Sequence, residues 1–217
     1  MNKLFSLLCK IFLGPPIHFF LIKEIKGLEN IPKKNFILAS NHLSHLDIIV
    51  CGYLCVPRRF TYIGQVDRYS GFQGFLRDFF YFFGGVIPVN RKDPFSRKTA
   101  LEKAVQSLKR GDILIIYPEG TRSRTGKIQE GKLGVAKIFL KTGVPILPVG
   151  IKGTFELLPP GGKLKIKRIV GINIGKPLIF QREFEIAKNL SEDSQEYNEL
   201  LQKITKKIME EIENLIK

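Results

Sequence analysis

Residues 36–54 read FILASNHLSHLDIIVCGYL, and this stretch decides the fold class. Its first part, residues 36–39, is a short apolar run typical of a buried strand. Ser44 has the residue type of a helix N-cap, with Asp47 three positions later and an apolar run at residues 48–54. A buried strand that passes through a polar loop into a helix is typical of an α/β protein.

The same alternation continues along the chain. Further buried strands are predicted at residues 86–89, 113–117 and 146–149, and a half-exposed strand at 164–174, where apolar residues share one parity. Helices are predicted at 97–109, 133–140 and 197–215. We therefore expect an α/β fold with a mostly parallel central sheet flanked by helices.

Two polar loops, residues 40–44 and 119–124, each follow a predicted strand immediately. In open α/β sheets, ligands bind outside the carboxyl ends of the strands. Strand order alone therefore brings both loops toward one crevice.

Composition allows a single domain and points to anionic partners. The chain has 217 residues and a formal net charge of +15. Residues 191–217 carry four basic and seven acidic residues, so the rest of the chain stands at +18. Such a field attracts nucleic acid, anionic lipid or phosphorylated substrates. The three cysteines, Cys9, Cys51 and Cys55, do not form a zinc or disulfide framework and fit a reducing compartment.

Residues 4–22 are strongly apolar, but Lys10, Gly14 and the pair Pro15-Pro16 interrupt them. A spanning helix needs roughly 20 uninterrupted apolar residues, and no clear cleavage site marks a signal peptide. We expect two short segments, hinged at the prolines, that lie in the membrane interface with lysines on anionic headgroups. The alternative is a helix docked on the protein's own core.

His42 and Asp47 form a candidate catalytic pair. Five positions apart, they meet only if His42 lies in the loop and Asp47 in the first helical turn. An aspartate that accepts the Nδ1–H of an imidazole fixes its tautomer and leaves Nε2 as a general base. The alternative is that Asp47 only caps the helix and His42 is a structural loop residue. Spacing alone favours this plainer interpretation, and His18 and His45 are expected to be structural or surface residues.

Four stretches together resemble the 1-acyl-glycerol-3-phosphate acyltransferase family of glycerolipid acyltransferases. Residues 27–47 are similar to the family's lead-in to its Asn-His-x-Ser-x-x-Asp block. Residues 85–91 (GVIPVNR), 118–123 (PEGTRS) and 144–149 (VPILPV) resemble its later blocks, in the right order and spacing. The resemblance runs from about residue 24 to residue 154, and its first and third blocks are the specific ones.

The resemblance implies transfer of a fatty acyl group from acyl carrier protein or coenzyme A to the sn-2 hydroxyl of lysophosphatidic acid, giving phosphatidic acid. It makes His42 the base and Asp47 its orienting partner, with no acyl-enzyme, metal or cofactor. The acceptor site it implies comprises Asn41, Ser44, Arg68, Arg91, Glu119, Gly120, Thr121 and Arg122. A guanidinium suits bidentate phosphate binding.

These inferences divide the chain into a membrane-anchoring segment at residues 1–22 and an acyltransferase domain at residues 23–217. We expect a monotopic protein on the cytoplasmic face of the cell membrane, in contact with anionic bilayer lipids.

The second block departs from the family pattern. It usually begins with a lysine that helps to hold phosphate; counting back from Arg91 places Arg68 there, or Gln65 if the loop is shorter. Residues 75–78 (FLRD) replace the family's Pro-x-x-Gly. The aromatic run at residues 72–83 is either core packing or a wall against bilayer lipid or the acyl chain.

Other functions would use some of the same features. Nucleic-acid binding would use the positive charge, but the aromatic residues do not alternate with basic ones and no known motif is present, so we expect no nucleic-acid partner. A thioesterase or phospholipase would use the same pair with water as acceptor, and would leave the arginines without a purpose. An acyltransferase for another lysolipid is a further alternative.

Overall fold

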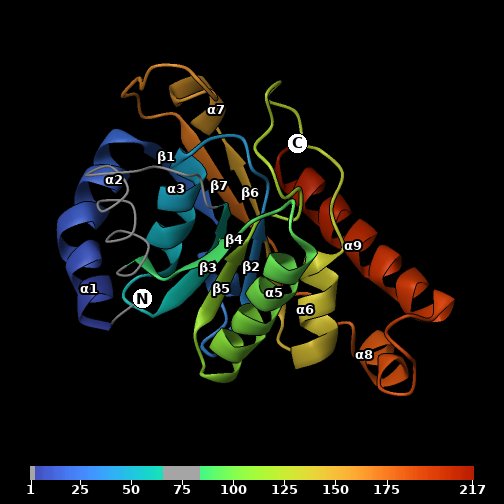
Figure 1. The fold of residues 1–217 in the computed structure, drawn as a ribbon. Helices are drawn as coiled ribbons and strands as arrows, with labels where there is room; N and C mark the ends of the chain where they lie inside the picture. Colours follow the sequence, from blue (N-terminus) through green and yellow to red (C-terminus); the bar gives the residue numbers. More distant parts are fainter. Residues whose placement is uncertain (1–2, 66–83) are drawn as a thin grey trace.

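The computed structural model describes residues 3–65 and 84–217. Within them, seven strands form one sheet: β1 (Ile22–Lys26), β2 (Ile37–Ser40), β3 (Phe60–Gln65), β4 (Val86–Val89), β5 (Ile113–Ile116), β6 (Ile146–Lys152) and β7 (Val170–Ile174). Their spatial order is β1-β7-β6-β2-β5-β3-β4 (Figure 1). From β6 to β4 all neighbours are parallel, whereas β7 is antiparallel to β6 and parallel to β1.

Helices cover both faces of this sheet. They are α1 (Lys3–Leu8), a π-helical turn (Cys9–Leu13), α2 (Gly14–Phe20), a 3-10 turn (Leu28–Asn30), α3 (Leu46–Cys55), α5 (Pro94–Lys109), α6 (Gly134–Thr142), α7 (Thr154–Leu157), α8 (Gln181–Ala187) and α9 (Gln195–Leu215). Figure 1 shows α1, α2 and α3 on one side of the sheet and α5, α6 and α9 on the other.

The central strands are buried throughout because both of their faces are covered. Every residue of β2 and β5 is buried, as expected for parallel strands between two helical layers. Successive side chains of a strand point to opposite faces. Ile37 and Ala39 accordingly join the core under α5, α6 and α9, and Leu38 joins the core under α3.

The predicted α/β fold with a mostly parallel, helix-flanked sheet is therefore confirmed. The predicted strand at 164–174 is correct only from Val170 onward. Strand pairing explains the difference: Val170 is the first residue of β7 with a partner in β1, and β6 ends at Lys152 opposite Gly171. Residues 161–168 have no neighbouring strand and are exposed.

The N-terminal segment is helical from residue 3 to residue 20, so the hinge expected at the prolines is not present. Pro15 lies in the first turn of α2, where its missing N–H is not needed, and the irregularity is the π-helical turn that precedes it. The contacts that tie the segment to the domain include two polar ones: Ser6 Oγ donates to the Arg58 carbonyl at 2.8 Å, and His18 Nδ1 lies 3.1 Å from the Tyr53 hydroxyl.

By length and composition Lys3–Phe20 is a candidate membrane span, and only 11% of it is buried in the protein. Its exposed apolar side chains are Leu4, Leu7, Leu8, Ile11, Phe12, Leu13, Phe19 and Phe20. The segment therefore touches the domain along a narrow face and leaves most of its apolar surface uncovered.

Candidate active site

The candidate site lies where parallel strands end together. The loop at residues 41–45 follows β2, and residues 117–124 follow the neighbouring strand β5. Because β2 and β5 are parallel, the two loops leave the sheet at the same edge. The two loops therefore lie together, as predicted from strand order, and the Ser123 N–H donates to the His42 carbonyl across them at 2.8 Å.

His42 and Asp47 meet across the start of α3. His42 Nδ1 lies 3.0 Å from Asp47 Oδ2, with His42 in the loop and Asp47 in the first helical turn. The same carboxylate oxygen accepts the backbone N–H groups of Leu43 and Ser44, each at 2.7 Å. Asp47 is fully buried. Donation from Nδ1–H to this carboxylate leaves Nε2 as the nitrogen able to accept a proton.

One carboxylate, that of Asp47, both caps the start of α3 and bonds His42, so the contacts expected from each interpretation of Asp47 are present. Asp47 reaches back to the Ser44 N–H as in a capping box. The N-cap residue itself is His45, one position later than predicted, and its side chain forms no cap. Ser44 Oγ instead accepts the Leu46 N–H at 3.1 Å and donates to the Leu158 carbonyl at 2.7 Å.

Glu119 holds the backbone of His42. Its Oε1 accepts the His42 N–H at 2.7 Å, and its Oε2 accepts the backbone and side-chain N–H groups of Gln129 at 3.0 and 3.2 Å. The His42 carbonyl accepts the Ser123 N–H at 2.8 Å. Burial raises the pKa of Glu119, and the donors from His42 and Gln129 oppose that rise. The loop after β5 thereby fixes both backbone polar groups of His42.

Asn41 joins the same loop to the end of β6. Its Nδ2 donates to the Ile151 carbonyl and its Oδ1 accepts the Ile151 N–H, both at 2.8 Å. Asn41 and Ser44 are fully buried, and their side chains are engaged by backbone. The resemblance implied substrate contact for both residues; the geometry supports a positioning role for them, and for Glu119.

Tyr117 is a residue that the sequence analysis missed. Its ring stacks on the His42 imidazole with 4.0 Å between centroids and 13° between planes. Its hydroxyl is buried, and burial, followed by Cys51 and Asp47, raises its pKa well above the usual value, so the phenol stays neutral. The available signal was position: Tyr117 directly follows β5, the strand beside β2.

The predicted phosphate-binding residues form the open part of the site. Gly120 has a φ of +71°, and a Cβ there would lie 3.0 Å from the Lys132 side chain. Lys132 therefore adds a cation beside this loop that the sequence analysis did not name. Thr121 accepts a bond from Gln129 Nε2 at its carbonyl. Arg122 is partly exposed and has no ion-pair or hydrogen-bond partner in the described part of the chain.

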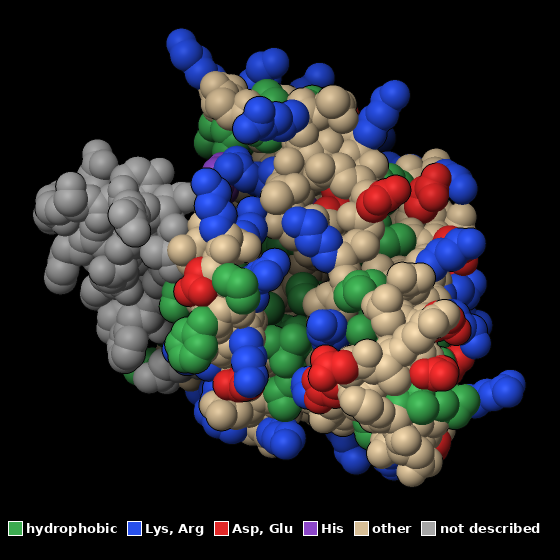
Figure 2. Space-filling view, turned by 45° about the vertical axis from the view of Figure 1, so that its right-hand side comes forward, with side chains coloured by type: hydrophobic (Ala, Val, Ile, Leu, Met, Phe, Trp, Pro, Cys, Tyr) green, Lys and Arg blue, Asp and Glu red, His purple; other side chains and the backbone are tan. Residues whose placement is uncertain are grey.

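The second block is only partly described. Arg91 follows β4 and is exposed, and its N–H donates to Gln65 Oε1 at 3.3 Å. Arg68 and the aromatic run at 72–83 lie outside the described residues, so their predicted roles stay predictions. Figure 2 shows lysine and arginine side chains spread over one face of the molecule, in line with the formal net charge of +15.

This arrangement defines a class of protein: an α/β protein that holds a His–Asp pair beside basic side chains at the carboxyl ends of its strands. The sequence model of the family named Acyltransferase matches residues 23–152. The chain therefore belongs to the acyltransferase family.

Curated relatives of the chain support this family assignment. The chain is 30% identical over 165 residues to the chloroplastic 1-acyl-sn-glycerol-3-phosphate acyltransferase BAT2 of Brassica napus, which covers 75% of this chain and 46% of the relative. It is 33% identical over 141 residues to the 1-acyl-sn-glycerol-3-phosphate acyltransferase of Borreliella burgdorferi, covering 60% and 51%. The chain thus spans about half the length of these curated relatives.

Among solved structures, the fold resembles the crystal structure of the 1-acyl-sn-glycerophosphate (LPA) acyltransferase PlsC of Thermotoga maritima. The TM-score is 0.61 at 27% identity, and the match covers 97% of this chain and 78% of that one. The likeness extends beyond residues 23–152 to nearly the whole chain.

Proposed function

We propose that this protein transfers a fatty acyl group from an acyl thioester to the sn-2 hydroxyl of 1-acyl-glycerol-3-phosphate, giving phosphatidic acid. The observation that carries the proposal is the bond between His42 and Asp47, together with Arg122 on the next loop, which has no ion-pair or hydrogen-bond partner among the described residues. The names of the relatives support the same acceptor. Coenzyme A and acyl carrier protein are both candidate carriers of the acyl group.

In the proposed reaction His42 Nε2 takes the proton of the lipid hydroxyl as its oxygen attacks the thioester carbonyl carbon. The new C–O bond forms a tetrahedral intermediate, which collapses as the C–S bond breaks. The leaving thiolate then takes the proton from the imidazolium and departs as a thiol. Asp47 stabilises the imidazolium between the two transfers.

A direct attack is supported by the chemistry of the nearby cysteine. Cys51 lies in α3 beneath the pair and is fully buried. Burial raises the pKa of its thiol to about 12, so almost none of it is thiolate at neutral pH. Since the thiolate is the nucleophilic form of cysteine, Cys51 is not suited to carry an acyl group.

We assign binding of the acceptor's phosphate to basic side chains on and beside the loop after β5, residues 117–124. Arg122 supplies a guanidinium that has no ion-pair or hydrogen-bond partner among the described residues. The Lys132 side chain lies against Gly120 of the same loop, and Arg91 follows β4 at the same edge of the sheet. A guanidinium with free donors suits bidentate binding of a phosphate. Arg68 belongs to this proposal by resemblance alone.

We also propose that residues 1–22 attach the domain, residues 23–217, to the cytoplasmic face of the cell membrane. The exposed apolar face of Lys3–Phe20 supports attachment. Cytoplasmic placement is supported by free, reduced cysteines and by the need for thioester donors.

The test is thiol release from an acyl thioester with and without lysophosphatidate. We expect release that depends on lysophosphatidate and yields phosphatidate in equal amount. Release at the same rate without any lipid acceptor would mean that water is the acceptor, and the chain would then be a hydrolase. Strict dependence on a different lysolipid would change the acceptor and keep the reaction.

A further inference from the structure

The segment between α7 and β7 is a basic loop that the active site does not use. Residues 159–168 read PPGGKLKIKR, with four basic residues and no acidic one. Every residue from 161 to 168 is exposed. We call this segment the basic loop.

Two large apolar side chains of the basic loop face solvent. Leu164 is 55% exposed and Ile166 is 69% exposed, and they alternate with Lys163, Lys165 and Lys167. Single exposed apolar residues are ordinary on protein surfaces. Alternation with lysines is informative because, at a bilayer surface, apolar side chains enter the acyl boundary while lysines extend to the headgroups.

The fold places the basic loop at the sheet edge that carries the active site. β7 and β1 are antiparallel to β6, so they begin at the edge where β2, β5 and β6 end. Leu158, which precedes the basic loop, accepts the bond from Ser44 of the catalytic loop. The residue immediately before the basic loop is therefore bonded directly to the segment that holds His42.

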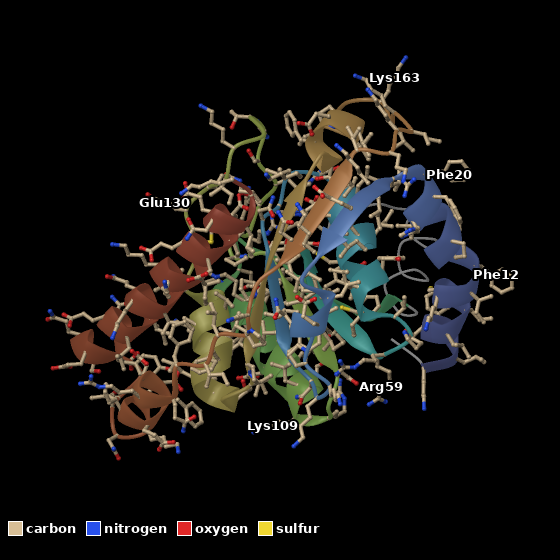
Figure 3. The ribbon with its side chains drawn as sticks, turned by 180° about the vertical axis from the view of Figure 1, so that it is seen from behind. Phe12, Phe20, Arg59, Lys109, Glu130 and Lys163 are labelled. Atoms are coloured by element: carbon tan, nitrogen blue, oxygen red, sulfur yellow. The ribbon has the colours of Figure 1, made fainter. Side chains whose placement is uncertain are left out.

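The other end is bonded to the N-terminal segment. Arg168 Nε donates to the Ile22 carbonyl, and the Val170 N–H donates to the Leu21 carbonyl, both at 2.8 Å. Figure 3 shows Lys163 and Phe20 close together at one end of the molecule, with Phe12 further along the same side and Lys109 at the opposite end. The basic loop thus continues the exposed apolar surface of Lys3–Phe20.

We propose that the basic loop is a second membrane-contact element, which binds the headgroups of an anionic bilayer. Charge complementarity, continuity with the N-terminal apolar surface and position at the active-site edge carry this inference. Together, the N-terminal segment and the basic loop turn the site toward the membrane that holds the acceptor. The inference rests on the proposed function only in taking a membrane lipid as substrate.

The experiment measures flotation of the full chain with two kinds of vesicle, phosphatidylcholine alone and phosphatidylcholine with roughly one third phosphatidylglycerol. The test variant carries Lys163→Glu, Lys165→Glu and Lys167→Glu. The matched control carries Lys98→Glu, Lys109→Glu and Lys137→Glu, which change net charge equally on exposed positions of α5 and α6. A second variant, Leu164→Ser with Ile166→Ser, removes the apolar contribution without changing charge.

Each lysine at an anionic surface contributes about a fivefold factor in partitioning. We expect the test variant to lose at least about 20-fold in partitioning to anionic vesicles and less than about twofold on phosphatidylcholine. The control should lose much less on anionic vesicles. The serine variant should weaken binding to both kinds of vesicle.

Equal losses of partitioning for the lysine-to-glutamate test variant and its control would overturn the proposal. It would also be overturned if that test variant lost as much partitioning on phosphatidylcholine vesicles as on anionic ones. Unchanged thermal unfolding of the variants excludes misfolding as the cause. Acylation of lysophosphatidate in detergent micelles reports on the proposed function separately. A wild-type chain inactive there would refute the acyl transfer, while flotation would still decide the role of the basic loop.

Discussion

Two side chains on neighbouring loops at the same edge of the sheet are held in opposite ways. In the loop after β2, His42 has its N–H bonded to Glu119, its carbonyl bonded to Ser123, and its ring held between Asp47 and Tyr117. In the loop after β5, Arg122 has no ion-pair or hydrogen-bond partner among the residues that the structure describes. One side chain is fixed before substrate arrives, and the other is free.

This difference matches two chemical tasks. A general base must sit within hydrogen-bond reach of the hydroxyl, and a misplacement of about 1 Å costs roughly 100-fold in rate. A phosphate-binding guanidinium gains most of its energy when the ligand supplies the acceptor oxygens. Substitutions that disturb the placement of His42 should therefore lower kcat and stability, whereas substitution of Arg122 should raise the KM for the acceptor.

The largest effect on kcat is expected for substitution of His42, the proposed general base. His42→Ala should lower kcat by about 10³-fold, within the range of general-base catalysis, and leave vesicle flotation unchanged. The control is His45→Ala, an exposed histidine three positions away in the same loop, which should keep kcat within about threefold. Initial rates at saturating lysophosphatidate measure both. A His42→Ala enzyme with kcat within tenfold of wild type would remove His42 from the reaction.

Substitution of Glu119 tests whether the position of His42 depends on the hydrogen bond from its N–H to Glu119. Glu119→Gln replaces an oxygen that accepts an N–H with an amide that donates, so it should lower the free energy of unfolding by about 1–3 kcal/mol. It should also lower kcat by roughly 10- to 100-fold through misplacement of His42, with little change in acceptor KM. Urea unfolding and steady-state kinetics measure the two effects.

The matched control for that variant is Glu130→Gln, an exposed glutamate in the same segment, which should change neither quantity appreciably. A rise in acceptor KM with an unchanged kcat would mean that Glu119 contacts the substrate directly, as the family resemblance implies.

The parts of the fold and site that follow local rules were predictable from sequence. The runs at 36–39 and 113–117 formed strands because apolar strands fit the middle of a covered sheet. The run at 86–89 formed the partly exposed edge strand β4. The geometry of His42 and Asp47 was predictable because only one arrangement of loop and helix start lets the two side chains meet.

Contacts between distant segments were not predictable in this way. Glu119 bonds the backbone of a residue 77 positions away, and Asn41 bonds one 110 positions away, and nothing in the local pattern indicates either pairing. Residues 164 and 166 have strand parity but no strand beside them, so parity alone was misleading there. The start of α3 moved by one residue because Asp47 and Ser44 share the capping bonds.

Substitution of Arg122 should change the affinity for the acceptor rather than kcat. Arg122→Ala should raise the KM for lysophosphatidate by roughly 10- to 100-fold, since a charge-assisted hydrogen bond contributes about 1.5–3 kcal/mol. Its kcat at saturating acceptor should stay within about threefold, and Arg122→Lys should recover only part of the loss. Arg124→Ala, an exposed neighbour, serves as the control. A fall in kcat at constant KM would place Arg122 on the reacting atoms.

The smallest effect is expected at Tyr117, where ring and hydroxyl can be separated. Tyr117→Phe keeps the ring stacked on His42, so kcat should stay within about twofold. Tyr117→Leu removes the π face beside the imidazolium, so it should lower kcat by roughly 3- to 10-fold at constant KM. Because burial raises the pKa of Tyr117 well above its usual value, the phenol does not ionise where activity is measured. The alkaline limb of the pH–rate profile should therefore be the same for wild type and Tyr117→Phe. A shift of that limb in the phenylalanine variant would mean that the hydroxyl takes part in proton transfer, and the site would then contain a second titrating group beside His42.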